Sequence, residues 1–260
     1  MKKIVAIGGG ENGRISEDGK KLDYETREID EEIIRLTEKK KPNYLFICHS
    51  FSFSKEIQDS YYETMKKIYG DIFGCNCKHL RSDELTDMET VKKKVEWADI
   101  IYEGGGDTGS MIKLWKKTKF DKVLYNAWQD GKVICGISAG AVCWFNACNS
   151  DTEEEEKKFE EINCLKWFNL FTTPHADEEG RMESTKSQLK RNKKIGLMMS
   201  NRSALEIIDD KYRVLKSKFE KKGLKKPFII KGYWKDKEFI EHELTNETMF
   251  KDMKELFKKD

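Results

Sequence analysis

Long hydrophobic runs and an excess of charge of one sign are both missing from this sequence of 260 residues. No apolar segment approaches the roughly 18–20 residues that a membrane-spanning helix needs. The 49 Lys and Arg residues nearly balance the 47 Asp and Glu residues, which leaves a formal net charge of +2. So small a charge gives no electrostatic reason to expect nucleic acid or an anionic membrane as a partner. We therefore expect a soluble protein.

A disulfide framework is missing as well. The seven cysteines form an odd set without regular spacing, so we expect most of them to be small buried apolar groups in a reducing compartment. The apolar stretch at residues 3–7 is too short for the core of a signal peptide, and glycines follow it at once. These features predict a cytoplasmic location.

Potential metal ligands are sparse. Cys75, Cys77 and His79 alternate along the chain, so they would share one face of a strand. A metal site built on them would need support from a second ligand cluster, and none is visible in the sequence. We expect a plain buried strand here and no bound metal.

Short apolar strands alternate with amphipathic helices through the first 200 residues. The expected strands cover residues 3–7, 44–48, 75–80, 99–102 and 132–135, and the expected helices cover 29–38, 55–69, 86–97, 108–117 and 120–129. This alternation predicts an α/β fold with a mostly parallel, doubly wound sheet and helices on both of its faces. Strands expected at 195–199, 205–208 and 212–215 predict an antiparallel C-terminal extension, followed by a helix from about residue 247. Because no flexible linker interrupts the chain, we expect one domain over residues 1–260.

The segment Gly136-Ile137-Ser138-Ala139-Gly140 fits G-x-S-x-G, a pattern that places a serine on a sharp turn between a strand and a helix. Residues 132–135 have the composition of a buried strand, and residues 139–145 that of an apolar helix start. This context favours an activated nucleophile with backbone amides nearby for an oxyanion. A tight Gly/Ala-rich turn without catalytic role is the simpler alternative.

A serine hydroxyl needs a base within hydrogen-bond reach. Of the four histidines, His175 directly follows the apolar segment 168–174 and is the best candidate, and His49, after the strand at 44–48, is the second. The glycines at 104–106 follow another strand, so their amides can approach a ligand closely and could form an oxyanion hole with Ala139. An ordinary strand-to-helix turn explains these glycines equally well.

Four segments together resemble the peptidase E (dipeptidase E, S51) family, whose members are related to cyanophycinase and have a class I glutamine-amidotransferase-like fold. These segments are Ile-Gly-Gly-Gly-Glu-Asn-Gly at 7–13, Tyr-Glu-Gly-Gly-Gly-Asp-Thr at 102–108, Gly-Ile-Ser-Ala-Gly-Ala at 136–141 and Pro-His-Ala-Asp at 174–177. The resemblance implies a flavodoxin-like sheet, with Ser138 as nucleophile and His175 as base. It also implies oxyanion donors at Gly105 or Gly106 and at Ala139. Because family members include dipeptidases that remove an N-terminal aspartate, it implies that Arg181 holds the substrate carboxylate.

The acid that would orient His175 is where this sequence departs from the family. Asp151 is the nearest match to the aspartate that dipeptidase E carries after the nucleophile, with Glu153, Asp177 and Glu178 as rivals. Other members have a glutamate where this chain reads Met-Ser-Asn-Arg at 199–202, and Asn146 stands where many close relatives have glutamate. A wrong orienting group costs orders of magnitude in turnover. The resemblance therefore implies a weak or altered enzyme as an open alternative.

Two other patterns point to different chemistry and are less consistent with the sequence. Gly8, Gly10 and Gly13 match a dinucleotide fingerprint, but a polar loop follows them where that fingerprint requires a helix. Amidotransferase chemistry uses a cysteine at the turn, whereas Cys135 lies three residues earlier, inside the expected strand. We therefore expect a serine exopeptidase that acts on short peptides without a cofactor, as a monomer or homodimer. The alternative is an inactive relative that binds a small ligand or a protein partner in the same crevice.

Overall fold

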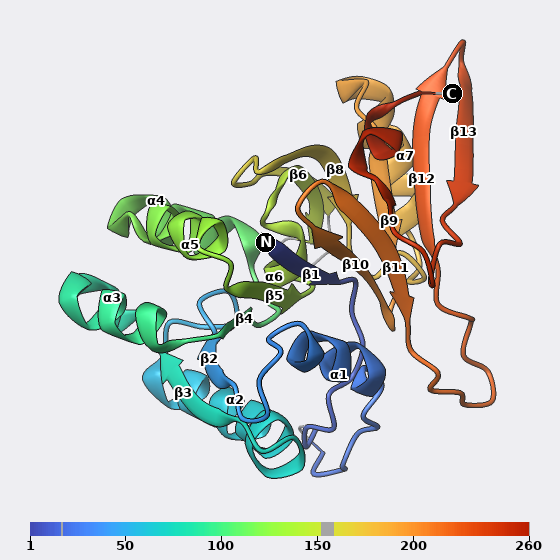
Figure 1. The fold of residues 1–260 in the computed structure, drawn as a ribbon. Helices are drawn as coiled ribbons and strands as arrows, with labels where there is room; N and C mark the ends of the chain where they lie inside the picture. Colours follow the sequence, from blue (N-terminus) through green and yellow to red (C-terminus); the bar gives the residue numbers. More distant parts are fainter. Residues whose placement is uncertain (17, 152–158, 260) are drawn as a thin grey trace.

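The computed structural model describes residues 1–16, 18–151 and 159–259, which form two β-sheets flanked by helices (Figure 1). The larger sheet has eight strands in the order β14-β11-β10-β1-β5-β4-β2-β3. Its parallel part consists of β1 (Lys3–Ile7), β2 (Asn43–Ile47), β3 (Asn76–Leu80), β4 (Ile100–Glu103) and β5 (Val133–Ile137). Its antiparallel part consists of β10 (Ser203–Ile208), β11 (Lys211–Lys216) and β14 (Lys251–Asp252). The predicted parallel sheet with an antiparallel extension is thereby confirmed.

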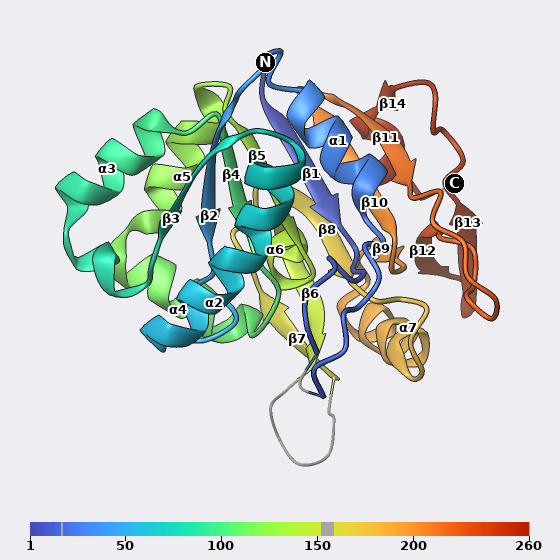
Figure 2. The same ribbon diagram turned by 90° about the horizontal axis from the view of Figure 1, so that it is seen from below.

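Helices cover both faces of the parallel part, as the sequence predicts (Figure 2). Successive side chains of a strand point to opposite faces, and in β1 Val5 and Ile7 pack with α1 and α2, while Ile4 and Ala6 pack with α3, α4 and α5. The helices are α1 (Arg27–Arg35), α2 (Lys55–Lys66), α3 (Met88–Trp97), α4 (Thr108–Thr118) and α5 (Phe120–Gln129), with a π-helical turn at Lys67–Ile72 and a 3₁₀ turn at Asp83–Thr86. None of the helices in the described part of the chain has the length and apolar character needed to span a bilayer.

A second sheet, which the sequence did not indicate, packs beside the first. Its order is β13-β12-β9-β8-β6-β7, and α7 packs on β6 to β9 and β12 (Figure 1). The elements are β6 (Phe145–Asp151), β7 (Phe159–Asn163), β8 (Phe168–Thr173), α7 (Arg181–Asn192), β9 (Gly196–Met199), β12 (Ile229–Lys235) and β13 (Glu238–Glu243).

Two expected helices are wrong. The helix after the serine, α6 (Ala139–Val142), has only 4 residues, and the apolar run continues as strand β6 because Phe145 pairs with Phe168. The helix expected from residue 247 is replaced by β14, which pairs with β11, and by a short 3₁₀ helix at Met253–Phe257. In both places pairing with a distant strand overrides the local preference.

The carboxyl end of β1 ties the loops of the two sheets together. The carbonyl oxygens of Ile7, Gly8 and Gly9 accept hydrogen bonds from the amides of Ser138 (2.9 Å), His175 (2.9 Å) and Arg202 (2.8 Å), respectively. Ser138 follows β5 of the first sheet, whereas His175 follows β8 and Arg202 follows β9 of the second. Three consecutive residues therefore fix three loops that are far apart in the sequence.

Candidate active site

Ser138 occupies a strained turn between β5 and α6. Its backbone has φ 54° and ψ −112°, a conformation that costs a non-glycine residue roughly 1–3 kcal/mol. The flanking glycines are required by contact, since a Cβ at Gly136 would lie 2.5 Å from the carbonyl oxygen of Gly140, and one at Gly140 would lie 2.3 Å from that of Glu103. The structure thus has the strand–turn–helix geometry that exposes a nucleophile at the end of a sheet.

His175 lies within hydrogen-bond distance of this serine. Its Nε2 is 2.9 Å from Ser138 Oγ, although 37 residues separate the two in the sequence. Its Nδ1 is 2.7 Å from Asn201 Oδ1, so the Nδ1–H donates to the amide oxygen. That bond fixes the tautomer in which Nε2 carries the lone pair, and Nε2 can accept the serine proton.

Asn201 is the residue that the sequence reasoning missed. It lies in the loop after β9, within the segment 199–202 that has no carboxylate, and its backbone N–H donates to Asp177 Oδ1 at 2.7 Å. Asp177 therefore accepts a hydrogen bond from the backbone of Asn201 and helps to fix the position of that residue. Glu178 lies nearer the ring, with Oε1 3.4 Å from His175 Nδ1. The feature of the sequence that points to Asn201 is its side-chain amide oxygen, which accepts a hydrogen bond from an imidazole N–H as a carboxylate does.

The structure does not place Asp151 beside His175, which corrects the prediction that it orients the base. Its Oδ2 accepts a hydrogen bond from Arg181 Nη2 at 3.1 Å, because β6 points it toward the start of α7. Its rival Glu153 lies outside the described residues. Asn146 also lies away from the serine, on β6, where its Nδ2 donates to Asn169 Oδ1.

Gly9 makes room for the histidine and its amide partner. A Cβ at this position would lie 2.1 Å from Asn201 Oδ1 and 2.4 Å from His175 Nδ1, closer than any side chain tolerates. The N-terminal glycines therefore belong to this site. They do not open a helix as a dinucleotide fingerprint requires, because α1 begins only at Arg27.

The glycine loop after β4 lies against the serine. A Cβ at Gly105 would be 3.4 Å from Ser138 Cβ, and the amide of Gly140 donates to Gly104 O at 3.1 Å, which ties the loop to the turn. The Gly105 backbone bonds to the Tyr61 hydroxyl and so opposes the rise that burial causes in the pKa of Tyr61. This arrangement favours the amides of Gly106 and Ala139 as the oxyanion donors.

A cleft of about 300 Å³ opens over Ser138. Its lining consists of Gly10, Glu11, Asn12, Arg14, Phe51, Tyr61, Gly105, Gly106, Ile137, Ser138 and His175. Glu11 and Arg14 form a two-pronged ion pair, with Arg14 Nε 3.0 Å from Glu11 Oε2 and Arg14 Nη2 3.2 Å from Glu11 Oε1. Both side chains are partly exposed, at 37% and 48%. The cleft thus offers one charge of each sign to a bound molecule.

Arg181 does not line this cleft, which corrects its predicted role as the carboxylate-binding residue. Its side chain is 3% exposed, pairs with Asp151, and lies over the ring of Phe159 with Cζ 4.8 Å from the centroid. Its Nε is also 3.7 Å from Glu178 Oε2. A buried guanidinium already neutralised by carboxylates is a poor site for a substrate carboxylate.

His49, the second candidate base, is a buried structural residue. Trp115 Nε1 donates to its Nδ1 at 2.9 Å, so its Nε2 carries the proton and donates to Leu80 O at 2.8 Å. Burial lowers the pKa of His49 to about 4, which keeps the ring neutral. Both ring nitrogens are occupied and His49 cannot act on Ser138.

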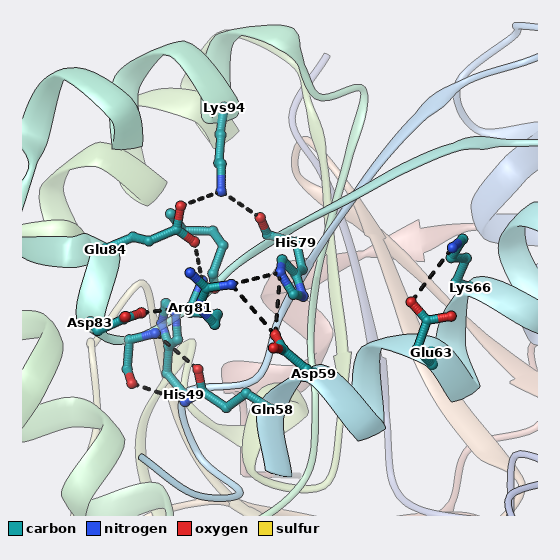
Figure 3. Close-up of polar contacts among 12 residues, drawn as sticks. His49, Gln58, Asp59, Glu63, Lys66, His79, Arg81, Asp83, Glu84 and Lys94 are labelled. Atoms are coloured by element: carbon teal, nitrogen blue, oxygen red, sulfur yellow. Dashed lines mark hydrogen bonds and ion pairs between the residues drawn. The ribbon is translucent and has the colours of Figure 1, made fainter. Parts of the chain in front are cut away.

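The Cys75–His79 segment forms strand β3 and its approach, without shared ligand geometry. Burial raises the pKa of Cys75 to about 12 and that of Cys77 to about 11, so both thiols stay protonated. His79 faces Asp59, with Nε2 3.5 Å from Oδ1, in a cluster with Arg81 (Figure 3). In the described ranges, no group of three or more His, Cys, Asp or Glu side chains is placed to hold a metal ion.

Comparison with known proteins gives one consistent result. The family model of peptidase family S51 matches residues 11–215. The uncharacterized peptidase YgaJ of Bacillus subtilis (strain 168) is 28% identical over 212 residues, which cover 81% of this chain and 85% of that protein. A crystal structure of a peptidase from an acI-B1 actinobacterium superimposes with a TM-score of 0.70 at 17% identity, covering 97% of each chain. A putative peptidase E protein of Listeria monocytogenes EGD-e gives a TM-score of 0.57 at 17% identity, covering 83% of this chain and 98% of that one.

Proposed function

The chain belongs to peptidase family S51, and from this we propose that it is a serine exopeptidase that hydrolyses short peptides through an acyl-enzyme on Ser138. One observation carries the proposal. Ser138 Oγ, His175 Nε2, His175 Nδ1 and Asn201 Oδ1 form a continuous hydrogen-bonded series with distances of 2.9 and 2.7 Å. A serine, a base and a group that orients the base are the parts that nucleophilic acyl transfer requires.

The reaction follows from these contacts. Ser138 Oγ attacks the scissile carbonyl carbon while its proton moves to His175 Nε2, and the amides of Gly106 and Ala139 hold the negative oxygen of the tetrahedral intermediate. The imidazolium then gives that proton to the leaving amine, and the C–N bond breaks. A water molecule attacks the acyl-enzyme by the same route, with His175 as base, and releases the acid and free Ser138.

The cleft supports a substrate with a charged amino-terminal residue. Arg14 presents a guanidinium and Glu11 a carboxylate beside the nucleophile, so the α-ammonium group of a peptide can pair with Glu11 and an acidic side chain with Arg14. On binding, the ammonium group of the substrate would replace Arg14 as the partner of Glu11, and its acidic side chain would replace Glu11 as the partner of Arg14. We therefore assign to Arg14 the role that the sequence had suggested for Arg181, and we propose peptides with an acidic first residue.

A fluorophosphonate probe tests the nucleophile. We expect the intact protein to be labelled at Ser138, and the Ser138→Ala and His175→Ala variants to show only background labelling. The partly exposed serine at position 16 gives a matched control, because Ser16→Ala should leave labelling unchanged. Labelling of the intact protein no stronger than that of Ser138→Ala would refute the enzyme and favour a binding protein.

A dipeptide panel tests the substrate. We expect Asp-X dipeptides to be cleaved with at least tenfold higher kcat/KM than neutral X-X dipeptides, and N-acetylation to reduce cleavage by a similar factor. Arg14→Gln should abolish the preference for Asp-X. Arg181→Gln should lower the stability of the protein and leave that preference unchanged. An intact protein that is indifferent to the first side chain, or an Arg14→Gln variant that keeps the preference for Asp-X, would show that the Glu11–Arg14 pair does not select substrates.

The amide at the hydrogen-bonding position of His175, with the Glu178 carboxylate farther away at 3.4 Å, favours one other candidate function. With an amide at Asn201, the cleft is also consistent with a relative that binds a peptide and turns it over slowly or not at all. Calorimetric binding of Asp-X peptides without hydrolysis, together with no probe labelling, would identify this alternative.

A further inference from the structure

The interior behind the glycine loop contains a carboxyl group that the proposed reaction does not use. Glu103 is the last residue of β4, has no exposed surface, and directly precedes the loop at 104–106. Its Oε1 accepts two hydrogen bonds from Ser50, one from the amide at 3.1 Å and one from the hydroxyl at 2.9 Å. An acid buried this deeply costs stability that an apolar residue of similar size would not cost, and its Oε2 has no hydrogen-bond partner among the described residues.

Ser50 touches the glycine loop at both of its ends. Its hydroxyl lies 3.0 Å from the carbonyl oxygen of Gly104, and its own carbonyl oxygen accepts the amide of Asp107 at 2.6 Å. A Cβ built at Gly106 would lie only 2.2 Å from that carbonyl oxygen, so Gly106 packs directly on Ser50. The backbone of Gly106 has φ 145°. The position of Ser50 therefore determines where the amide of Gly106 points.

The backbone of Glu103 also supports the nucleophile turn. Its carbonyl oxygen lies 2.3 Å from a Cβ built at Gly140 and 2.6 Å from one built at Gly136, so both glycines of the turn pack on it. The backbone of Glu103 thus contacts the turn that carries Ser138. Its side chain contacts Ser50, which in turn supports the glycine loop.

Burial favours the neutral form of the Glu103 carboxyl group. Loss of hydration raises its pKa well above the ordinary value of 4.5, and the hydrogen bonds from Ser50 oppose the rise without cancelling it. The titratable groups that interact with it are Cys48, Tyr61 and Cys143, and burial raises the pKa of each, so all three are neutral as well. A neutral acid still accepts through Oε1, as a glutamine amide would.

We propose that Glu103 is a positioning residue that, through Ser50, holds the glycine loop at the distance from Ser138 at which the Gly106 amide meets the oxyanion. The inference rests on the proposed function for its catalytic consequence. It concerns a geometric role, so the acceptor at Oε1 matters and the negative charge does not.

Three single variants and one double variant test this role. Glu103→Gln keeps an acceptor of the same shape, so its kcat should stay within about threefold of the original. Glu103→Leu removes the acceptor and Ser50→Ala removes one donor, and each should lower kcat about 10- to 100-fold with little change in KM, somewhat less than the loss of an oxyanion donor itself. The double variant Glu103→Leu/Ser50→Ala should be no slower than the worse single variant, because both changes break the same contact.

Amide hydrogen exchange at residues 104–107 gives a readout that does not depend on catalysis. We expect the amide of Asp107 to exchange at least tenfold faster in Glu103→Leu and Ser50→Ala than in Glu103→Gln, with thermal unfolding showing that all three are folded. Unchanged exchange, unchanged kcat in Glu103→Leu, or a Gln variant as impaired as the Leu variant would overturn the inference. If exchange responds as expected but no form of the protein turns over a peptide, the proposed function fails and the bracing role stands.

Discussion

Replacing Asn201 by aspartate should make this enzyme faster. Asn201 Oδ1 accepts the Nδ1–H of His175 at 2.7 Å, which orients the ring but contributes no formal charge. When Ser138 gives up its proton the ring becomes an imidazolium, and the group opposite Nδ1 then faces a positive charge. A carboxylate stabilises that state better than an amide does.

The size of the gain follows from the kind of hydrogen bond that changes. A neutral hydrogen bond contributes a net ~0.5–1.5 kcal/mol and one to a charged group ~1.5–3 kcal/mol. The midpoints of these ranges differ by about 1.25 kcal/mol, which corresponds to nearly a tenfold rise in kcat/KM. Glu178, whose Oε1 lies 3.4 Å from Nδ1 and whose side chain is 43% exposed, already supplies a screened negative charge. Glu178→Gln should therefore slow the original enzyme only a few-fold and enlarge the gain from Asn201→Asp.

Steady-state hydrolysis of an Asp-X dipeptide by the single variants, and by the double variant Glu178→Gln/Asn201→Asp, measures these effects. Asn201→Asp should raise kcat/KM about tenfold, and Asn201→Leu should lower it by about 10²–10⁴, because the ring loses its orientation and its tautomer. Asn169→Asp, the same change on the exposed face of β8, is the matched control and should have no effect. A slower Asn201→Asp enzyme together with an inactive Asn201→Leu enzyme would show that the amide –NH₂ is what the site needs. A fully active Asn201→Leu enzyme would remove Asn201 from the mechanism.

Three further predictions concern stability and close contacts. Because the pKa of Glu103 is raised, its stabilising neutral form is fully present below pH 4.5 and is lost as the pH rises. The free energy of unfolding of the original protein should therefore fall relative to that of Glu103→Gln by up to about 1.4 kcal/mol per pH unit between pH 5 and the folded-state pKa. Free energies of unfolding from urea denaturation that change with pH in the same way for both proteins would contradict this. The pKa of His49 is lowered from 6.5 to about 4, so the stability of its neutral form is present above pH 6.5 and about 3 kcal/mol of it is lost by pH 4, a loss that His49→Gln should not show. Gly9→Ala should lower kcat/KM at least about 100-fold, since the new Cβ displaces Asn201 and His175, and an active, folded variant would disprove the packing argument.

The parallel half of the fold is predictable from the sequence because its signals are local. The helix expected at residues 120–129 begins and ends where α5 does, and the apolar runs of β1, β2, β4 and β5 are short and bounded by turn residues. The second sheet is not predictable in this way. Residues 139–145 are apolar without a period, and only the parallel pairing of Phe145 with Phe168 decides that the chain leaves the helix after Val142.

The residues of the candidate site show the same division between those that a local sequence pattern predicts and those that only the fold brings together. Ser138 and His175 each follow an apolar strand and carry a reactive group, so local pattern singles them out. Arg14 and Arg181 look alike in the sequence, and burial alone distinguishes them, since one is 48% exposed in the cleft and the other 3% exposed beneath Asp151. Asn201 is not singled out by its sequence, because the group that usually orients a catalytic histidine is a carboxylate and asparagine has none. Its role exists only because the fold brings residue 201 within 2.7 Å of residue 175.

The segment 7–9 shows how one strand end coordinates groups from two sheets. Its three carbonyl oxygens accept the amides of Ser138, His175 and Arg202, the last being the neighbour of Asn201. Ser138, His175 and the loop that carries Asn201 are therefore held by consecutive residues, whose spacing the backbone fixes at about 3.8 Å per residue. Glycine is needed at positions 8 and 9 because a Cβ at either would meet Met199 and Ser200 or Asn201 and His175. A shift of the second sheet relative to the first would change the hydrogen bonds of His175 and Arg202 at once, so the second sheet helps to fix the geometry of the candidate site.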